Sequence, residues 1–281
     1  MTSPAILLKA WGIHPRKSMG QHFLADPAVA SAIVEKGGFS SGDTVIEIGA
    51  GLGALTIPLA AVAGHVFAVE PDDRIAGLLR NELLAAGAAN VTIVVKDILA
   101  CEIAPLVGGS RVPVRVAGNL PYHISSAVLL YLVERRSVVR SALLMFQKEV
   151  AERLLAGPGS KAYGRLTVLV QYSGAVEHIT EVPAGAFWPR PQVDSTVVVI
   201  RFFDPPPYPA GDEGFFSRLV RAAFGKRRKM LKNALLKSDL RVEPSQILCA
   251  CQQAGIDPKT RAETLGVKDL VRLSDALRES L

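Results

Sequence analysis

Cysteine is scarce in this sequence, and long apolar runs are missing from it. The 281 residues include three cysteines, Cys101, Cys249 and Cys251, whose spacing matches neither CxxC nor CxxH. They therefore predict no zinc site and suit a reducing compartment as small packing residues. No stretch approaches the roughly 18 apolar residues that span a bilayer, and the N-terminus has no apolar run followed by a cleavage site. We expect a cytoplasmic monomer with no metal and no membrane partner.

Aromatic residues make up only 6% of the chain, but hydrophobic residues make up 49%, which excludes a disordered or fibrous protein. The chain is long enough for one large core and a smaller second domain. Its net charge of +6 is uneven, because residues 1–204 carry 18 basic and 17 acidic side chains whereas residues 205–281 carry 14 and 9. This local excess of positive charge suits either a polyanionic partner or a solvated helix surface.

Short apolar runs alternate with longer segments of helical spacing through the first two thirds of the chain. The runs predicted to be strands are 44–48, 66–69, 91–95, 114–117, 142–146, 167–172 and 196–202. This alternation predicts an α/β, Rossmann-like fold with a mostly parallel seven-stranded sheet and helices on both faces. The last two runs have no long helix between them, so we expect them to form the antiparallel end of the sheet.

A proline-rich spacer follows the last predicted strand, at Pro205, Pro206, Pro207 and Pro209. Proline can neither continue a strand nor occupy a helix interior, so the spacer marks a domain boundary. Beyond it, apolar residues recur at spacings of three and four, with a break at Gly225. We therefore predict a catalytic domain over residues 1–204 and a small all-helical domain over residues 205–281.

A glycine-rich segment, Gly49-Ala50-Gly51-Leu52-Gly53, closes the first predicted strand and precedes a predicted helix over 54–61. Glycines at such a junction let the backbone approach a ligand, and the helix N-terminus offers free N–H groups. With Ala54 the segment also satisfies the GxGxxA form of the dinucleotide fingerprint. Glycine spacing alone therefore leaves open a nicotinamide cofactor or another nucleoside cofactor.

Two acidic residues end the next two predicted strands. Glu70 follows Gly49 by 21 positions, where a carboxylate can accept hydrogen bonds from both ribose hydroxyls. Asp97 ends the third strand at the same sheet edge and could bind the amino group of an adenine ring, although it could instead be the N-cap of the next helix. Glu47 lies inside the first strand, where a buried acid needs a backbone N–H or a ligand as partner.

The fourth predicted strand ends in Gly118-Asn119-Leu120-Pro121-Tyr122. The Asn119 amide oxygen and a nearby main-chain carbonyl, with Leu120 as the candidate, form two acceptors for the hydrogens of an exocyclic amine, and Tyr122 offers a flat face to a base. Two acceptors would localise the nitrogen lone pair for attack on a methyl group without a strong general base. The alternative is a turn that caps the next helix, in which Tyr122 is only a packing residue.

These motifs resemble those of adenine methyltransferases that use S-adenosylmethionine, and further segments narrow the resemblance to the small-subunit ribosomal RNA adenine dimethyltransferases, the kasugamycin-sensitivity family. The matching segments run in order from about residue 16 to about residue 266 and include 20–24, 147–154, 160–166, 187–195 and 224–229. The resemblance implies dimethylation of two adjacent adenosines near the 3′ end of small-subunit (16S) rRNA. The small ribosomal subunit would then be the partner.

The resemblance also implies roles for individual residues. Cofactor contacts fall on His22, Leu24, Gly49, Gly51, Glu70, Asp97 and Asn119, and base stacking falls on Tyr122 and Phe187. From the positive charge of the C-terminal region, we expect Arg227, Arg228 and Lys229 to bind RNA. The sequence departs from the family at His22 and His123, where the family usually has Asn, and at Ala50, where it usually has Pro. His22 keeps a ring nitrogen that can hydrogen-bond, so we expect cofactor binding to survive.

Three other functions stay open at this point. The antibiotic-resistance methyltransferases of large-subunit rRNA share the glycine loop and Asn-Leu-Pro-Tyr, although segments 155–165 and 227–229 favour the small subunit. A nicotinamide oxidoreductase is compatible with the glycine loop but gives no reason for Asn-Leu-Pro-Tyr. An RNA-binding factor that has lost catalysis would not need intact Gly49, Glu70, Asp97, Asn119 and Tyr122.

Overall fold

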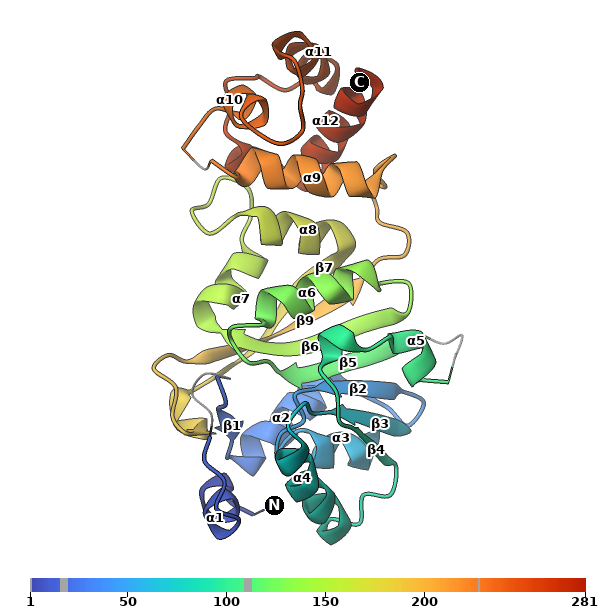
Figure 1. Ribbon diagram of the computed structural model, residues 1–281, viewed down its shortest axis with the longest axis vertical. Helices are drawn as coiled ribbons and strands as arrows, with labels where there is room; N and C mark the ends of the chain where they lie inside the picture. The colour runs from blue at the N-terminus through green and yellow to red at the C-terminus, as the bar shows by residue number, and fades with distance from the viewer. Residues whose placement is uncertain (1, 16–19, 109–112, 227) are drawn as a thin grey trace. The chain divides into compact units, whose positions relative to one another are not determined.

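Seven strands form the central sheet, in the order β4-β3-β2-β5-β6-β9-β7 (Figure 1). They are β2 (Thr44–Ile48), β3 (His65–Val69), β4 (Val91–Val94), β5 (Val114–Asn119), β6 (Val139–Gln147), β7 (Gly174–Val182) and β9 (Ser195–Phe202). Neighbours among β2 to β6 pair in parallel, and β9 pairs antiparallel to β6. The predicted Rossmann-like α/β fold with a mostly parallel sheet is confirmed.

The computed structural model describes residues 2–15, 20–108, 113–226 and 228–281. The chain divides into two compact units, one of Met1–Ala151 and Val176–Phe202 and the other of Glu152–Ala175 and Phe203–Leu281. This division differs from a single cut at residue 204, because residues 152–175 group with the C-terminal helices. Across the described ranges, no helix has both the length and the hydrophobicity to cross a membrane.

Buried strands and amphipathic helices together account for the core of the first unit. The first six residues of β9 are buried, as expected for an interior strand covered on both faces.

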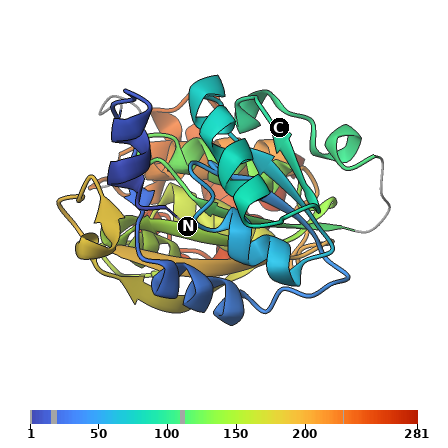
Figure 2. The same ribbon diagram turned by 90° about the horizontal axis from the view of Figure 1, so that it is seen from below.

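The strand order determines where the helices lie. From β2 the chain continues to β3 on one side of it in the sheet, and later runs from β5 to β6 on the other side. Right-handed crossovers therefore place the intervening helices on opposite faces of the sheet (Figure 2).

Aspartate side chains cap two helices of the first unit. The helices of this unit are α1 (Pro4–Ala10), α2 (Pro27–Gly37), α3 (Thr56–Val62), α4 (Asp73–Ala85), α5 (Ile103–Leu106), α6 (Ser125–Glu134) and the first half of α7 (Lys148–Leu155). Asp26 caps α2 by accepting from the backbone N–H groups of Ala28 and Val29, and Asp72 caps α4 by accepting from Arg74. Apolar residues of α2 and α3 pack in one cluster against the sheet.

Arg115 joins the end of α2 to the sheet. Its guanidinium donates to the carbonyl oxygens of Gly37 and Gly38, both at 2.6 Å, and to the carboxylate of Asp43 at 3.2 Å. Its Nε donates to Ser141 Oγ at 3.2 Å, and the side chain is almost fully buried. A buried cation with this many partners stabilises the unit only as long as all of them are present.

We expect Arg115→Met to lower the free energy of unfolding by about 3 to 5 kcal/mol, because it removes the donor to two helix-end carbonyls and the cation that pairs with the Asp43 carboxylate. Urea denaturation measures the change. Arg201→Met is the matched control: Arg201 pairs with Glu177 at the same 3.2 Å distance, but both side chains are exposed, so the loss should stay below about 1 kcal/mol. Equal losses in the two variants would contradict a structural role for Arg115.

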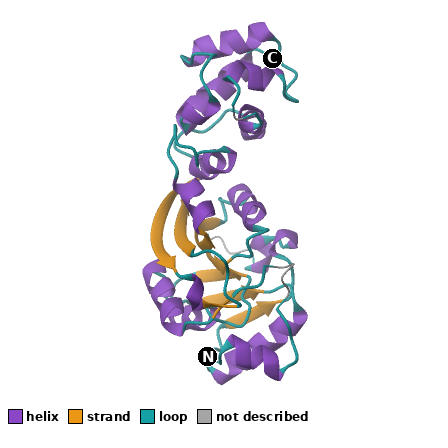
Figure 3. Ribbon diagram, turned by 90° about the vertical axis from the view of Figure 1, so that its left-hand side faces the viewer, coloured by secondary structure: helices purple, strands orange, loops and turns teal. Residues whose placement is uncertain are grey.

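The second unit is helical in its C-terminal part (Figure 3). Its helices are α8 (Arg165–Ser173), α9 (Glu213–Phe224), α10 (Leu231–Leu236), α11 (Pro244–Ala254) and α12 (Val267–Glu279). The helices expected after residue 205 are therefore present. The periodic apolar residues of α9, which include Phe216, Leu219 and Val220, are buried within this unit.

The prediction of a strand at 167–172 is wrong, because these residues lie within α8. The run is apolar almost throughout and is buried along most of its length, and such a run does not distinguish a strand from a buried helix. The Thr167 hydroxyl accepts from Gly164 N–H and donates to the Arg153 carbonyl, which fixes the first turn of the helix. The strand that completes the sheet is β7, in which apolar and polar residues are mixed.

Candidate functional site

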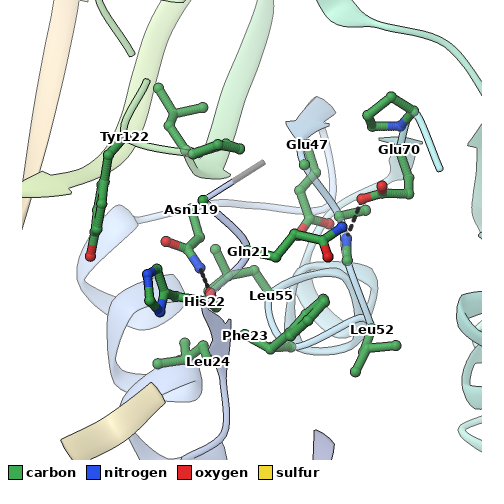
Figure 4. A pocket seen from close by; sticks show the side chains of 18 residues that line it. Gln21, His22, Phe23, Leu24, Glu47, Leu52, Leu55, Glu70, Asn119 and Tyr122 are labelled. Carbon is green, nitrogen blue, oxygen red and sulfur yellow. Dashed lines mark hydrogen bonds between the residues drawn. The ribbon is translucent and has the colours of Figure 1, made fainter. Parts of the chain in front are cut away.

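A pocket opens at the carboxyl ends of β2, β3 and β5, entirely within the first unit (Figure 4). It is lined by residues 20–24, Glu47, 49–52, 54–55, Glu70, Pro71 and 119–122. The sheet order reverses between β2 and β5, and ligands of open α/β sheets bind in the crevice at such a point. The structure thus brings together the glycine loop, Glu70 and the Asn-Leu-Pro-Tyr motif.

The glycine loop takes backbone conformations that favour glycine. Gly49, Gly51 and Gly53 have φ angles of 73°, 55° and 90°. A Cβ atom on Gly53 would lie 2.9 Å from a methyl group of Leu79, so a side chain there would clash. The loop extends two residues further than predicted, because α3 begins at Thr56 and not at Ala54.

Glu70 follows β3 and holds the glycine loop through its carboxyl group. Its Oε2 accepts from Gly51 N–H at 3.0 Å, and its Oε1 accepts from Asp72 N–H at 3.1 Å. Burial raises the pKa of this carboxyl, while the two backbone donors act in the opposite direction. Each oxygen keeps a further lone pair, so the group can still accept hydrogen bonds from ligand hydroxyls.

Glu47 lies in β2 and is fully buried at the floor of the pocket. Burial raises its pKa to about 8, and the nearby Glu70 carboxyl adds to the rise. Its Oε2 has no hydrogen-bond partner among the described residues. A buried carboxyl oxygen without a partner is stabilised by a ligand that brings a positive charge or a hydrogen-bond donor. S-adenosylmethionine carries both a sulfonium and an ammonium group. The residues present therefore fit this cofactor.

Asn119 ends β5 with its side-chain amide fixed by a main-chain carbonyl. Its Nδ2 donates to the carbonyl oxygen of His22 at 3.0 Å. A carbonyl can only accept, so this bond sets the orientation of the amide and directs Oδ1 toward the side of the pocket where Tyr122 lies (Figure 4). The acceptor that the sequence predicts is thus held in a defined direction.

Tyr122 is held at both its ring and its hydroxyl. Its ring stacks with the His22 ring at 5.7 Å between centroids and 30° between planes, and its hydroxyl lies 3.2 Å from Ser195 Oγ. His22 Nδ1 in turn lies 2.7 Å from the carbonyl oxygen of Pro189. Because a carbonyl only accepts, Nδ1 carries the hydrogen and donates it. Burial raises the pKa of Tyr122.

Two of the residues predicted to contact the cofactor or the base, Asp97 and Phe187, do not line this pocket. Asp97 is exposed and caps the 3₁₀ helix η2 (Ile98–Ala100), where its Oδ1 accepts from Leu99 N–H at 3.0 Å. Phe187 lies in β8 (Phe187–Trp188), which pairs antiparallel with β1 (Phe23–Leu24), and its side chain is buried beside Leu24 in the core. The capping role that the sequence left open for Asp97 is the one that the structure shows.

Two of the predicted RNA-binding residues, Arg228 and Lys229, lie between α9 and α10. Arg227 lies outside the described residues, whereas Arg228 and Lys229 are exposed and belong to neither helix. Gly225 ends α9 at this point.

Several pocket residues carry no signal of their own in the sequence. These residues are Gln21, Phe23, Leu52 and Leu55. Ser195 does not line the pocket, but its hydroxyl contacts that of Tyr122, which does. The segment 20–24 matches a family pattern but has neither strand nor helix periodicity, so resemblance is the signal that singles it out. Among the described residues, no cluster of three His, Cys, Asp or Glu side chains could hold a metal ion.

The fold, the glycine loop, the acid after β3 and the Asn-Leu-Pro-Tyr motif after β5 together define a methyltransferase that uses S-adenosylmethionine and acts on an amino nitrogen. The particular family follows from a match to the family model described as Ribosomal RNA adenine dimethylase, which covers residues 13–279. The chain belongs to this family. The predictions of the family and of its cofactor are confirmed.

Curated relatives and solved structures agree with this assignment. The chain is 47% identical to a ribosomal RNA small subunit methyltransferase A of Desulforapulum autotrophicum, over 99% of this chain and 97% of the relative, and 43% identical to one of Moorella thermoacetica, over 97% and 96%. It resembles the crystal structure of a dimethyladenosine transferase from Plasmodium falciparum with a TM-score of 0.77, 26% identity and coverage of 90% and 96%. It also resembles the crystal structure of the 23S rRNA methyltransferase ErmE, with a TM-score of 0.69, 26% identity and coverage of 91% of this chain and 99% of that one.

Proposed function

We propose that this protein dimethylates the 6-amino groups of two adjacent adenosines near the 3′ end of 16S rRNA during assembly of the small ribosomal subunit. The observation that carries the proposal is the fixed direction of Asn119 Oδ1, beside Tyr122 and at the edge of a pocket suited to S-adenosylmethionine. We also propose that the protein acts in the cytoplasm and as a monomer.

The cofactor would be held mainly by the glycine loop and Glu70. When bound, S-adenosylmethionine supplies an electrophilic methyl group on a sulfonium. Glu70 would accept the ribose hydroxyls, Gly49 and Gly51 would allow close approach of the backbone, and Glu47 would face the positively charged part. His22, Leu24 and Asp97 complete the set of cofactor contacts in this proposal.

Asn119, Leu120 and Tyr122 would prepare the acceptor base, and Phe187, whose side chain is buried beside Leu24, would have to move to stack on that base. The amine of adenine is a poor nucleophile because its lone pair is delocalised into the ring. Asn119 Oδ1 and the Leu120 carbonyl would accept its two hydrogens and favour a tetrahedral nitrogen, while the two aromatic rings hold the base by stacking. No strong base is needed, since the nitrogen becomes acidic only after it has been methylated.

Methyl transfer from labelled cofactor tests this function. The protein is incubated separately with unmethylated small subunits, large subunits and naked rRNA, and the labelled nucleotides are mapped. We expect two adjacent dimethylated adenosines near the 3′ end of 16S rRNA. Label on a large-subunit adenosine would instead assign the antibiotic-resistance type of activity, and absence of label on all three substrates would refute the proposal.

We also propose that residues 205–281 form a docking domain and that Arg227, Arg228 and Lys229 bind rRNA phosphates. Replacing all three by Ala should weaken binding to the small subunit and reduce the salt dependence of log K by about 0.7 to 0.9 for each phosphate that is no longer neutralised. Filter binding across a salt series measures this slope. Cofactor affinity should stay constant, because the described pocket lies in the first unit.

Arg272→Ala is the control for this variant. Arg272 is also a cation of the second unit, but it pairs with Asp269 at 2.7 Å, so its loss should leave the salt slope unchanged. Normal binding of the triple variant at raised salt would show that residues 227–229 are only a solvated surface.

A further inference from the structure

Ser195 is a fully buried residue whose hydroxyl partner belongs to the acceptor motif. It is the first residue of β9, and its Oγ lies 3.2 Å from the Tyr122 hydroxyl. A buried hydroxyl needs a partner, and a neutral hydrogen bond of this kind contributes to holding both groups in place. Beyond a family pattern, nothing in the sequence singles out Ser195.

The backbone around Ser195 is a rigid support. Ser195 pairs with Gln147 in the ladder between β9 and β6. The preceding residue, Asp194, accepts from Ala184 N–H through its Oδ1 at 2.8 Å, and Ala184 begins the turn that leads into Phe187. The segment that holds the Tyr122 hydroxyl therefore also holds the turn before the second aromatic residue of the proposed base site.

Two contacts restrain different motions of the Tyr122 ring. The phenolic oxygen lies on the axis about which the ring rotates, so its bond to Ser195 fixes the direction of that axis but leaves rotation about it free. The His22 ring, stacked at 5.7 Å and 30°, restrains the plane of the ring. His22 is itself held by the Pro189 carbonyl at 2.7 Å. Ser195 thus sets the direction of the ring axis relative to Asn119, and His22 sets the plane of the stacking face about that axis.

We propose that Ser195 is a positioning residue of the methyl transfer, which acts by fixing the Tyr122 ring so that a stacked base presents its amine to Asn119. The inference rests on the proposed function, because it assumes that Tyr122 stacks on the acceptor base. A ring free to tilt would still bind the base but would spend less time in the reactive alignment, so the effect should fall on kcat/KM for RNA.

A double-mutant cycle tests the proposal. Ser195→Ala and Tyr122→Phe each remove one side of the same hydrogen bond and keep the stacking face. We expect each to lower kcat/KM for small subunits by roughly three- to tenfold, the range of one neutral hydrogen bond, with cofactor Kd unchanged. Because the two groups act through one bond, the double variant should be no less active than either single variant.

Ser141→Ala is the matched control. Ser141 is also a buried strand serine, and its Oγ accepts a hydrogen bond of the same 3.2 Å length, from Arg115. It should lose stability without loss of kcat/KM, which separates positioning from general destabilisation. Parental activity in Ser195→Ala, or losses that multiply in the double variant, would overturn the role of Ser195 while leaving the proposed function intact. A parent chain that methylates no adenosine would overturn both.

Discussion

Asn119→Ala is expected to lower the rate of methyl transfer by about 100- to 1,000-fold, the usual cost of removing one preorganised polar group from an active site. The variant loses the oxygen that would accept a hydrogen from the adenine amine, and with it the restraint that localises the lone pair. It also loses the donor that holds the His22 carbonyl at 3.0 Å. Single-turnover transfer of labelled methyl groups to small subunits measures the rate.

Asn119→Asp separates these two losses. Aspartate keeps an acceptor for the amine but cannot donate to the His22 carbonyl when ionised. Partial activity in Asn119→Asp with little in Asn119→Ala would identify the acceptor as the main contribution. A rate within tenfold of the parent in Asn119→Ala would show that the amine is bound elsewhere.

Glu70→Ala should reduce affinity for S-adenosylmethionine by roughly 100- to 10,000-fold. Two charge-assisted hydrogen bonds to the ribose hydroxyls, each worth about 1.5 to 3 kcal/mol, account for this range. The Gly51 N–H also loses its acceptor, so the glycine loop should be less ordered in the free variant. Calorimetric titration with S-adenosylmethionine measures the change in Kd.

Glu82→Ala is the control for Glu70→Ala. Glu82 is another buried acid of the first unit, and its carboxylate accepts from the backbone N–H and the hydroxyl of Thr2 at 3.0 and 2.9 Å. This variant should lose stability but keep the cofactor Kd of the parent. If Glu70→Ala bound cofactor within a factor of two of the parent, the ribose would have to lie at another place in the pocket.

The parts of the fold that the sequence predicted well are those with a strong local pattern. The central parallel strands β2 and β5 are buried along nearly their whole length and are predicted from short apolar runs, and the three glycines of the loop all have positive φ angles that favour glycine. The run at 167–172 was misassigned because apolar residues without alternation suit a buried helix as well as a strand. Local pattern thus predicts an element but not always its type.

The arrangement of the site depends on contacts that no local pattern encodes. Asn119 and Glu70 were identified from their positions at strand ends, but the bond from Asn119 to the His22 carbonyl joins segments 97 positions apart. Tyr122 and Ser195 are 73 positions apart, and the chain between them must fold before they meet. The sequence therefore predicts which residues gather at the sheet edge, whereas the partners that orient them follow only from the tertiary structure.

The pairing of β1 with β8 has a consequence for the order in which the pocket can form. Phe23 lines the pocket and pairs with Trp188, so one wall is completed by a strand that is made near the end of the first unit. A nascent chain that has not yet released β8 from the ribosome has the glycine loop but lacks the pairing that holds this wall, and such distant contacts form slowly because their loop-closure entropy is large. A cofactor that binds only the finished pocket then stabilises the closed pair by mass action.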